Sequence, residues 1–125
     1  MRTSEVIINR WHKMNQGRIH VSLMSPTLNP KRPLYKDKSL DTYKRQSRIV
    51  KELADKYDLI LTQDGHDKGT ISFAYKELNI LGPKTLLSHS TGLTKEEIQI
   101  CSYTDTKIAH NPSSGNSYPS RCPVP

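Results

Sequence analysis

The chain has 125 residues, a formal net charge of +7 at pH 7 and a hydrophobic fraction of 34%. This length limits it to a single domain, and with one Phe and one Trp its core is small for an independent domain. No apolar run reaches membrane-spanning length, Met1 does not begin a signal peptide, and two cysteines make no disulfide framework. We therefore expect a cytoplasmic protein with no membrane partner.

The positive charge is concentrated in the first half of the chain. Residues 1–58 hold 13 Lys and Arg against 6 Asp and Glu, whereas residues 59–125 hold 6 of each. A basic half raises the hypothesis of nucleic-acid binding. However, the cations alternate with apolar residues at helical spacing, and no interleaving of aromatic and basic residues is present. Solvated helix faces explain the charge better, and we expect no nucleic-acid partner.

The first predicted elements are a helix and a strand. Residues 3–16 carry apolar side chains at helical spacing, and Gly17 is a natural C-terminal stop. Residues 18–24 alternate between apolar and polar side chains, which favours a strand. The helical positions are Val6, Ile7, Arg10, Trp11 and Met14, and one face of the strand holds Ile19, Val21 and Leu23.

A loop, a long helix and a strand come next. Prolines mark residues 25–38 as a loop, and a loop of this length in a compact domain is usually functional or mobile. An apolar stripe predicts a helix that ends at Tyr57, with Ser39 or Asp41 as its N-cap. Residues 58–63 form an apolar run that suits a buried strand.

The second half continues the alternation of helices and strands. After a polar loop at 64–69, the pattern predicts a helix at 70–79, a strand at 84–88, a helix at 95–103 and a strand at 107–110. This order predicts an α/β fold of about four βα units with a parallel sheet. Four strands make either half of an eight-stranded barrel or a small open sheet, and both outer strands would have unpaired edges.

The predicted helix at 95–103 has a clear start. Thr94 and Glu97 have the spacing of a capping box, in which each side chain binds a backbone amide of the first turn. Ile98 and Cys101 are expected to face inward. Cys101 is interpreted as a core residue, because no base is placed near it in the helix.

Histidines end the two strands that flank this helix. His89 follows the strand at 84–88, and His110 is the last residue of the strand at 107–110. The carboxyl ends of parallel strands share one rim, where α/β sheets and barrels bind ligands. From spacing alone, a buried strand-end histidine with a structural hydrogen bond is the safer interpretation of His89.

Three motifs in order resemble the amidohydrolase superfamily. Residues 81–89, 93–98 and 108–113 are similar to the branch that holds cytosine, guanine and S-adenosylhomocysteine deaminases and triazine chlorohydrolases. Weaker similarity extends over residues 17–26 and 51–63. The resemblance implies that the chain covers strands four to seven of a TIM barrel. It predicts a partial domain over the whole chain, truncated at both ends.

The resemblance also implies an activity and a set of site residues. The family uses a divalent metal, zinc or iron, to activate water, and hydrolyses a non-peptide C–N bond or a C–halogen bond in a small heterocyclic substrate. His89 matches the catalytic histidine at strand six, which orients water and substrate. At strand five, either Gln63 occupies the position of the metal-binding histidine, or His66 is that histidine displaced by three positions. His110 and Asn111 match the loop after strand seven, which shapes the substrate pocket.

The sequence departs from the family pattern in several places. It has no His-x-His pair and no strand-eight Asp, and no Glu occupies the proton-shuttle position, although Asp64 and Asp67 lie nearby. A catalytic zinc site uses three protein ligands and a water, and this chain offers one or two. We therefore expect that the chain alone does not assemble the active site. The alternative is a non-catalytic barrel remnant that pairs with another chain, either a second copy or a complementing partner.

Overall fold

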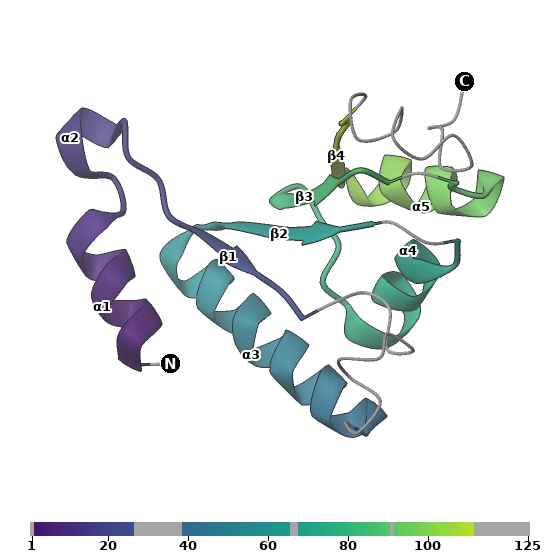
Figure 1. Ribbon diagram of the computed structural model, residues 1–125, viewed down its shortest axis with the longest axis horizontal. Coiled ribbons are helices and arrows are strands. Elements are labelled where there is room, and N and C mark those ends of the chain that lie inside the picture. Colours follow the sequence, from purple (N-terminus) through teal and green to yellow (C-terminus); the bar gives the residue numbers. More distant parts are fainter. Residues whose placement is uncertain (1, 27–38, 66–67, 91, 112–125) are drawn as a thin grey trace.

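The fold is known from a computed structural model that describes residues 2–26, 39–65, 68–90 and 92–111. Its centre is a four-stranded parallel sheet in the sequential order β1-β2-β3-β4 (Figure 1). The α/β class and the parallel sheet predicted from the sequence are therefore confirmed. The strands are β1 (Ser22–Met24), β2 (Ile60–Asp64), β3 (Thr85–Ser88) and β4 (Lys107–Ala109).

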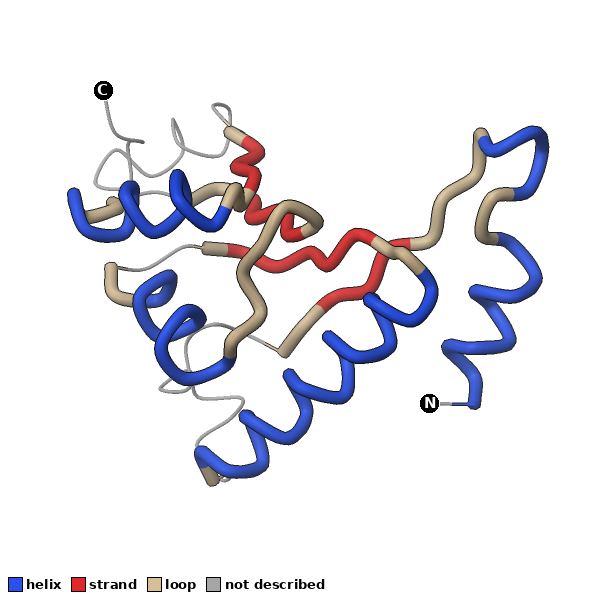
Figure 2. Tube along the Cα trace, turned by 180° about the vertical axis from the view of Figure 1, so that it is seen from behind, coloured by secondary structure: helices blue, strands red, loops and turns tan. Residues whose placement is uncertain are grey.

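Helices connect the strands and follow one another along the flank of the sheet (Figure 2). None of the helices in the described ranges is long and apolar enough to cross a membrane. The predicted helix at 70–79 forms as an α-helical turn that continues into a π-helical turn. The helices are α1 (Arg2–Trp11), α2 (Met14–Gly17), α3 (Leu40–Tyr57), α4 (Thr70–Phe73), the π-helical turn η2 (Ala74–Leu78) and α5 (Lys95–Thr104).

The sheet has the topology of a barrel segment. Doubly wound open sheets reverse their strand order at a switch point, whereas barrel strands follow one another in sequence. Here each strand pairs with its successor, and the helices pack on one face. Within the described residues, β1 and β4 each pair along one edge only.

The core lies between the sheet and its helices. Leu61 of β2 and Leu87 of β3 point to the helix-covered face, because side chains alternate along a strand. Burial of apolar area on this face is the main source of stability, at about 25 cal/mol per Å². The core residues are Ile8, Leu53, Ala54, Leu59, Leu61, Ile71, Ala74, Leu78, Ile80, Leu87, Ile100 and Cys101.

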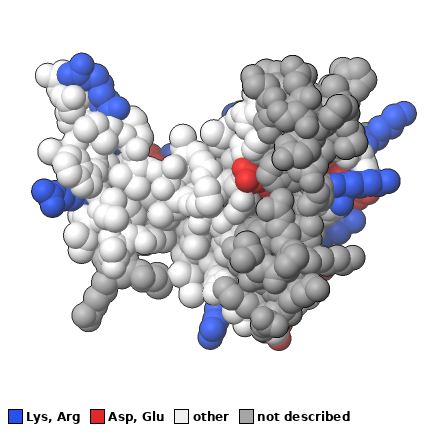
Figure 3. Space-filling model, viewed as in Figure 1, with Lys and Arg blue, Asp and Glu red and all other residues white. Residues whose placement is uncertain are grey.

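The opposite face of the first two strands carries exposed apolar side chains. Met24 is 70% exposed and Ile60 is 46% exposed, and both lie on the face away from Leu61. Figure 3 shows that Lys and Arg lie at the periphery of this view, while the surface over β1 and β2 is largely uncharged. Ser22 and Thr62 share this face, so it is mixed, and its exposed apolar side chains are ones that a further element would cover.

Helix α3 begins at one of the two predicted caps. Ser39 is the N-cap, and its hydroxyl accepts a hydrogen bond from the backbone amide of Thr42 at 3.2 Å. The helix ends at Tyr57, as predicted, with Asp58 in the left-handed conformation as the C-cap. Tyr43 and Leu53 are buried, so the predicted apolar stripe faces the core.

The capping box of α5 is confirmed, but one inward residue is corrected. The Thr94 hydroxyl accepts from the Glu97 amide at 3.2 Å, and the Glu97 carboxylate accepts from the Thr94 amide at 3.1 Å. Cys101 is buried as predicted, whereas Ile98 is 41% exposed. The cap orients Glu97 toward the core, and the positions three and four residues later share its face, so Ile100 is buried in place of Ile98.

Glu97 also caps the neighbouring helix. Its carboxylate is fully buried and accepts hydrogen bonds from the backbone amides of Ile71 at 3.1 Å and Ser72 at 3.3 Å. These amides belong to the first turn of α4, whose own N-cap, Gly69, has no side chain to offer. One carboxylate therefore satisfies the first turns of two helices, and the negative charge is favoured at both positive helix ends.

Replacement of Glu97 by Ala should lower the free energy of unfolding by about 2–4 kcal/mol, because the first turn of α4 loses its cap, α5 loses the carboxylate half of its capping box, and buried amides lose their acceptor. Glu96→Ala is the matched control. Glu96 is exposed and pairs only with Lys76 at 3.1 Å, so its loss should cost less than about 1 kcal/mol. Urea denaturation of both variants measures the difference. Equal losses would show that the double cap is not important for stability.

The amino-terminal segment differs from its prediction. The helix predicted over residues 3–16 ends at Trp11, because Lys13, Asn15 and Gln16 adopt left-handed backbone angles. The predicted strand shortens to the three residues of β1. Ile8 is the residue of α1 that joins the core. The predicted apolar positions are exposed instead, at 64% for Val6, 46% for Ile7, 44% for Trp11 and 50% for Met14.

A hydrogen bond of His12 connects the amino-terminal segment to Val21, the residue that precedes β1. Its Nδ1 accepts a hydrogen bond from the Val21 amide at 3.3 Å, which assigns the ring proton to Nε2. The pKa of His12 lies below its ordinary value, because burial disfavours the cation and nearby Lys13, His20 and Lys84 add positive charge. The fold therefore favours the neutral imidazole.

Acidification should weaken this attachment. The folded-state pKa of His12 is depressed, so the neutral side chain stabilises the fold. This contribution of His12 to stability is present above about pH 6.5 and is lost as the pH falls through the folded-state pKa. Urea denaturation at pH 7.5 and pH 5 should therefore show a larger loss for the wild type than for His12→Asn, whose side-chain oxygen still accepts from Val21. The same pH dependence in both proteins would contradict the assignment.

Candidate active site

The carboxyl ends of the strands bring polar side chains together at one rim. The register pairs Asp64 at the end of β2 with Ser88 at the end of β3, and Ser88 with Ala109 at the end of β4. Side chains of paired residues point to the same face of a sheet. Asp64 and Ser88 therefore lie side by side on the face away from the helices, at the rim where the sequence placed the candidate site.

His89 joins this pair and is held from two sides. The Ser88 hydroxyl donates to Asp64 Oδ1, and His89 Nε2 lies 4.0 Å from the same carboxylate oxygen. On the other side, Asn111 Nδ2 lies 3.3 Å from His89 Nδ1 and 3.4 Å from His89 Nε2. The His89 side chain is 23% exposed, so the imidazole is partly sheltered yet reachable from solvent.

The backbone that presents His89 adopts an uncommon conformation. His89 has φ of 61° and Ser90 has φ of 49°, both in the left-handed region that non-glycine residues rarely occupy. Two hydrogen bonds fix the turn, from the His89 amide to the Ala109 carbonyl at 3.0 Å and from the Ser90 amide to the Ser88 carbonyl at 2.7 Å. Such strain costs on the order of 1–3 kcal/mol for each residue and is concentrated at functional sites.

Gln63 lies at the same rim but shares the helix-covered face with Leu61 and Leu87. Both ends of its amide are engaged: Nε2 donates to the Ser25 carbonyl, and Oε1 accepts from the Asp64 amide at 2.7 Å. The bond to Ser25 ties the residue that follows β1 to the end of β2, whereas the bond from Asp64 is local to β2. A role of Gln63 in a substrate pocket stays a prediction.

The remaining predicted residues have different surroundings. Asn111 contacts the ring of His89, whereas His110 is exposed. His66 and Asp67 lie outside the described residues. Sequence reasoning named Asp64 only as a nearby carboxylate and did not name Ser88. The signal that could have found both is their position as the last residues of neighbouring parallel strands.

Within the described residues, the rim does not form a complete metal site. No group of three or more His, Cys, Asp or Glu side chains in these ranges could hold a metal ion. A catalytic zinc site uses three protein ligands, and the described rim gathers two suitable side chains, Asp64 and His89. These residues therefore do not fit a resident metal by themselves.

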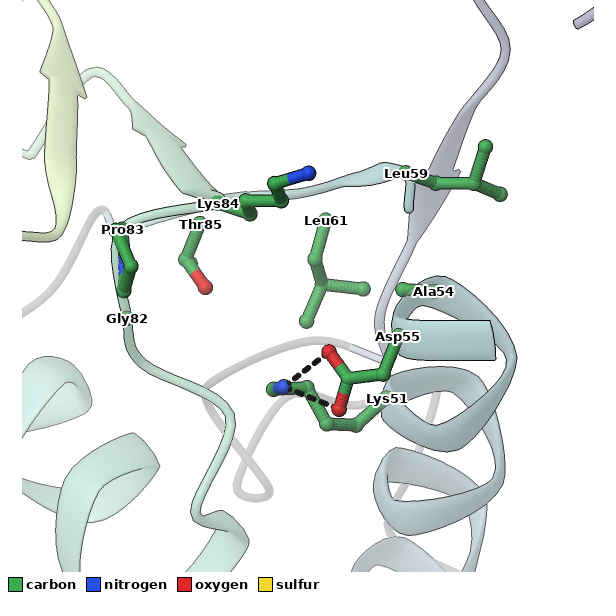
Figure 4. Close-up of a pocket in the computed structure, with 9 residues that line it drawn as sticks. All are labelled: Lys51, Ala54, Asp55, Leu59, Leu61, Gly82, Pro83, Lys84 and Thr85. Carbon is green, nitrogen blue, oxygen red and sulfur yellow. Dashed lines mark hydrogen bonds and ion pairs between the residues drawn. The ribbon is translucent and has the colours of Figure 1, made fainter. Parts of the chain in front are cut away.

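A cavity of about 230 Å³ lies at the opposite end of the sheet (Figure 4). Its walls come from the last turns of α3 and from the amino ends of β2 and β3, and an ion pair between Lys51 and Asp55 lies at its edge, with a separation of 2.6 Å. In barrels, the amino ends of the strands serve stability and the carboxyl ends carry the chemistry. We therefore place the candidate active site at the carboxyl rim and not in this cavity.

Known proteins share this segment. No protein-family model matches the chain. The chain is 30% identical to the 5'-deoxyadenosine deaminase of Methanothermobacter thermautotrophicus over 129 aligned positions. This alignment covers 91% of this chain and 27% of the deaminase. The crystal structure of an amidohydrolase from a Sargasso Sea environmental sample matches with a TM-score of 0.71 and 21% identity, over 94% of this chain and 25% of that one.

The chain therefore spans about a quarter of the length of each relative. Over this segment, the resemblance to the amidohydrolase superfamily is confirmed. The α/β fold with a parallel sheet, as part of a TIM barrel, is confirmed as well.

Replacement of Gln63 by Ala should lower the free energy of unfolding by about 1–2 kcal/mol, because the Ser25 carbonyl and the Asp64 amide lose a partly buried partner. The control is Gln99→Ala on the exposed face of α5, which should change stability by less than about 0.5 kcal/mol. Urea denaturation compares the two. No loss for Gln63→Ala would show that the amide does not hold β1 to β2.

Proposed function

We propose that the chain supplies part of the active site of a deaminase-like hydrolase. The reaction would break a C–N bond, or a C–halogen bond, in a small heterocyclic substrate. The observation that carries the proposal is the placement of His89 at the carboxyl rim, beside Asp64 and Ser88, in a segment that resembles amidohydrolases. The similarity of the chain to a 5'-deoxyadenosine deaminase favours a purine amine as the first substrate to test.

The chemistry assigns a proton-handling role to His89. In a hydrolytic deamination, water adds to the ring carbon that bears the amino group and ammonia leaves, so that one C–O bond forms and one C–N bond breaks. A neutral imidazole can accept a proton on one nitrogen and donate from the other near pH 7. Asn111 and Asp64 would hold the ring so that it faces the substrate, and Ser88 would keep the carboxylate in place.

Metal dependence is also part of this proposal. Besides His89, which handles the proton in this proposal, the described rim offers one carboxylate, that of Asp64, so the other ligands of a metal would have to come from elsewhere. They could be provided by His66, by other parts of a longer polypeptide or by a partner chain. Gln63 is a poor substitute for an imidazole ligand, and both ends of its amide are already hydrogen-bonded.

We propose further that additional barrel strands cover the open edges. Within the described residues β1 and β4 pair on one side only, and Met24 and Ile60 are exposed on an apolar face. The covering strands would come from a longer polypeptide, a second copy or a complementing chain. A barrel remnant without catalysis would need the same cover, so the pairing alone does not distinguish the two functions.

Replacement of His89 by Ala should lower the rate of ammonia release from 5'-deoxyadenosine by about 10²–10⁴-fold, the usual contribution of general acid–base catalysis. The assay uses the protein as isolated from its source with any natural partner, supplied with zinc or ferrous iron. His20→Ala is the control, because His20 is exposed and precedes β1 at the far end of the sheet. Circular dichroism shows whether both variants keep the fold.

An equal loss of activity in the two variants would contradict the assignment of His89. A loss that follows unfolding of His89→Ala would contradict it as well. Absence of ammonia release from the wild type, across purine and pyrimidine amines and with either metal, would favour the non-catalytic remnant.

A further inference from the structure

We propose that Gly65 is a positioning residue, which sets the place of the His89 imidazole through its contact with Ser90. The functional meaning of this proposal rests on the proposed function, whereas its geometry does not. Gly65 is buried directly after β2, and Ser90 is 4% exposed directly after His89. The two residues meet where the ends of β2 and β3 lie side by side.

The contact leaves little room for a side chain at position 65. A Cβ atom on Gly65 would lie 2.8 Å from Ser90 Oγ, closer than real Cβ contacts allow. Ile71 Cδ1 and Leu87 Cβ would each lie 3.7 Å away, in ordinary contact, so the core closes the other sides. The φ of Gly65 is outside the left-handed region. A side chain at position 65 is therefore opposed by space and not by backbone conformation, and it fits only where Ser90 or its hydroxyl shifts.

One carbonyl oxygen links Gly65 to the turn that carries His89. The Ser88 carbonyl accepts from the Gly65 amide at 3.0 Å and from the Ser90 amide at 2.7 Å. The Ser90 hydroxyl also lies 3.4 Å from this oxygen. Ser90 is 4% exposed, so its hydroxyl has little free space to turn into, and we infer that a Cβ at position 65 displaces the Ser90 backbone and with it the peptide units on both sides of His89.

The turn has little freedom to absorb such a push. His89 and Ser90 are two consecutive non-glycine residues with left-handed angles, a narrow region of backbone space. The ring of His89 depends on this turn for its contact with Asn111 and its approach to Asp64. Small displacements matter, because catalytic groups must be held to within about 0.5 Å of their working geometry.

The test compares three variants by NMR, in the full chain labelled with ¹³C at histidine. Gly65→Ala introduces the clash, and Gly65→Ala with Ser90→Gly removes the clashing hydroxyl and accepts the left-handed angle. Gly82→Ala is the matched control, because nothing lies within 4 Å of its Cβ position and its φ is outside the left-handed region. The loss of one Cε1–Hε1 signal in His89→Ala assigns the resonance of His89.

We expect Gly65→Ala to shift the His89 signal and to remove its nuclear Overhauser contact with the Asn111 amide. Gly82→Ala and the double variant should both keep the wild-type signal. If Gly65→Ala does not fold, recovery of the fold and of the signal in the double variant supports the proposal. An unchanged signal in Gly65→Ala, an equal shift in Gly82→Ala, or no recovery in the double variant would overturn it.

This readout separates the positioning role from the proposed reaction. The histidine signals report geometry and do not require turnover, so failure of the deaminase proposal would leave them as expected while no ammonia is released. In a protein that does release ammonia, Gly65→Ala should lower kcat and the double variant should recover it. Loss of activity with an unchanged His89 signal would contradict the positioning role of Gly65.

Discussion

The buried carboxylate of Glu97 is the interaction on which the arrangement of the second half depends. It accepts hydrogen bonds from the Thr94 amide at the start of its own helix and from two amides in the first turn of α4. These bonds fix the two helices relative to each other. A charge without water is tolerated only when it is well hydrogen-bonded. Because α4 follows β2 and α5 follows β3, this contact also fixes how the two strands lead into their helices.

The candidate site is a consequence of the same sheet. Parallel pairing in register places Asp64 beside Ser88, and the left-handed turn after β3 carries His89 next to both. The core-side contacts that stabilise the strands lie on the other face. The candidate site and the core therefore lie on opposite faces of the same strands. The strained backbone at His89 is hydrogen-bonded to the paired ends of β3 and β4.

Local sequence patterns predicted most of the helices and strands. The contacts between residues far apart in the sequence could not be predicted from it. The α5 capping box and the Ser39 cap involve residues three apart, so their spacing was visible in the sequence. The hydrogen bond from the Ile71 amide to Glu97 joins residues that are 26 positions apart in the sequence, and Gly65 and Ser90 are 25 positions apart. Neither contact has a local sequence pattern. The early end of α1 was missed because left-handed angles at Lys13 and its neighbours override the helical spacing.

We propose that this segment acts as part of a larger hydrolase barrel. Native mass spectrometry of the protein isolated from its own organism tests this most directly. We predict a species heavier than the 14.3 kDa of this chain, either as a longer polypeptide or as a complex, with a bound divalent metal. A metal-free, monomeric species of 14.3 kDa would contradict this proposal, because the part of the chain that the structure describes leaves both outer strands paired on one side only and gathers two donor side chains at the rim.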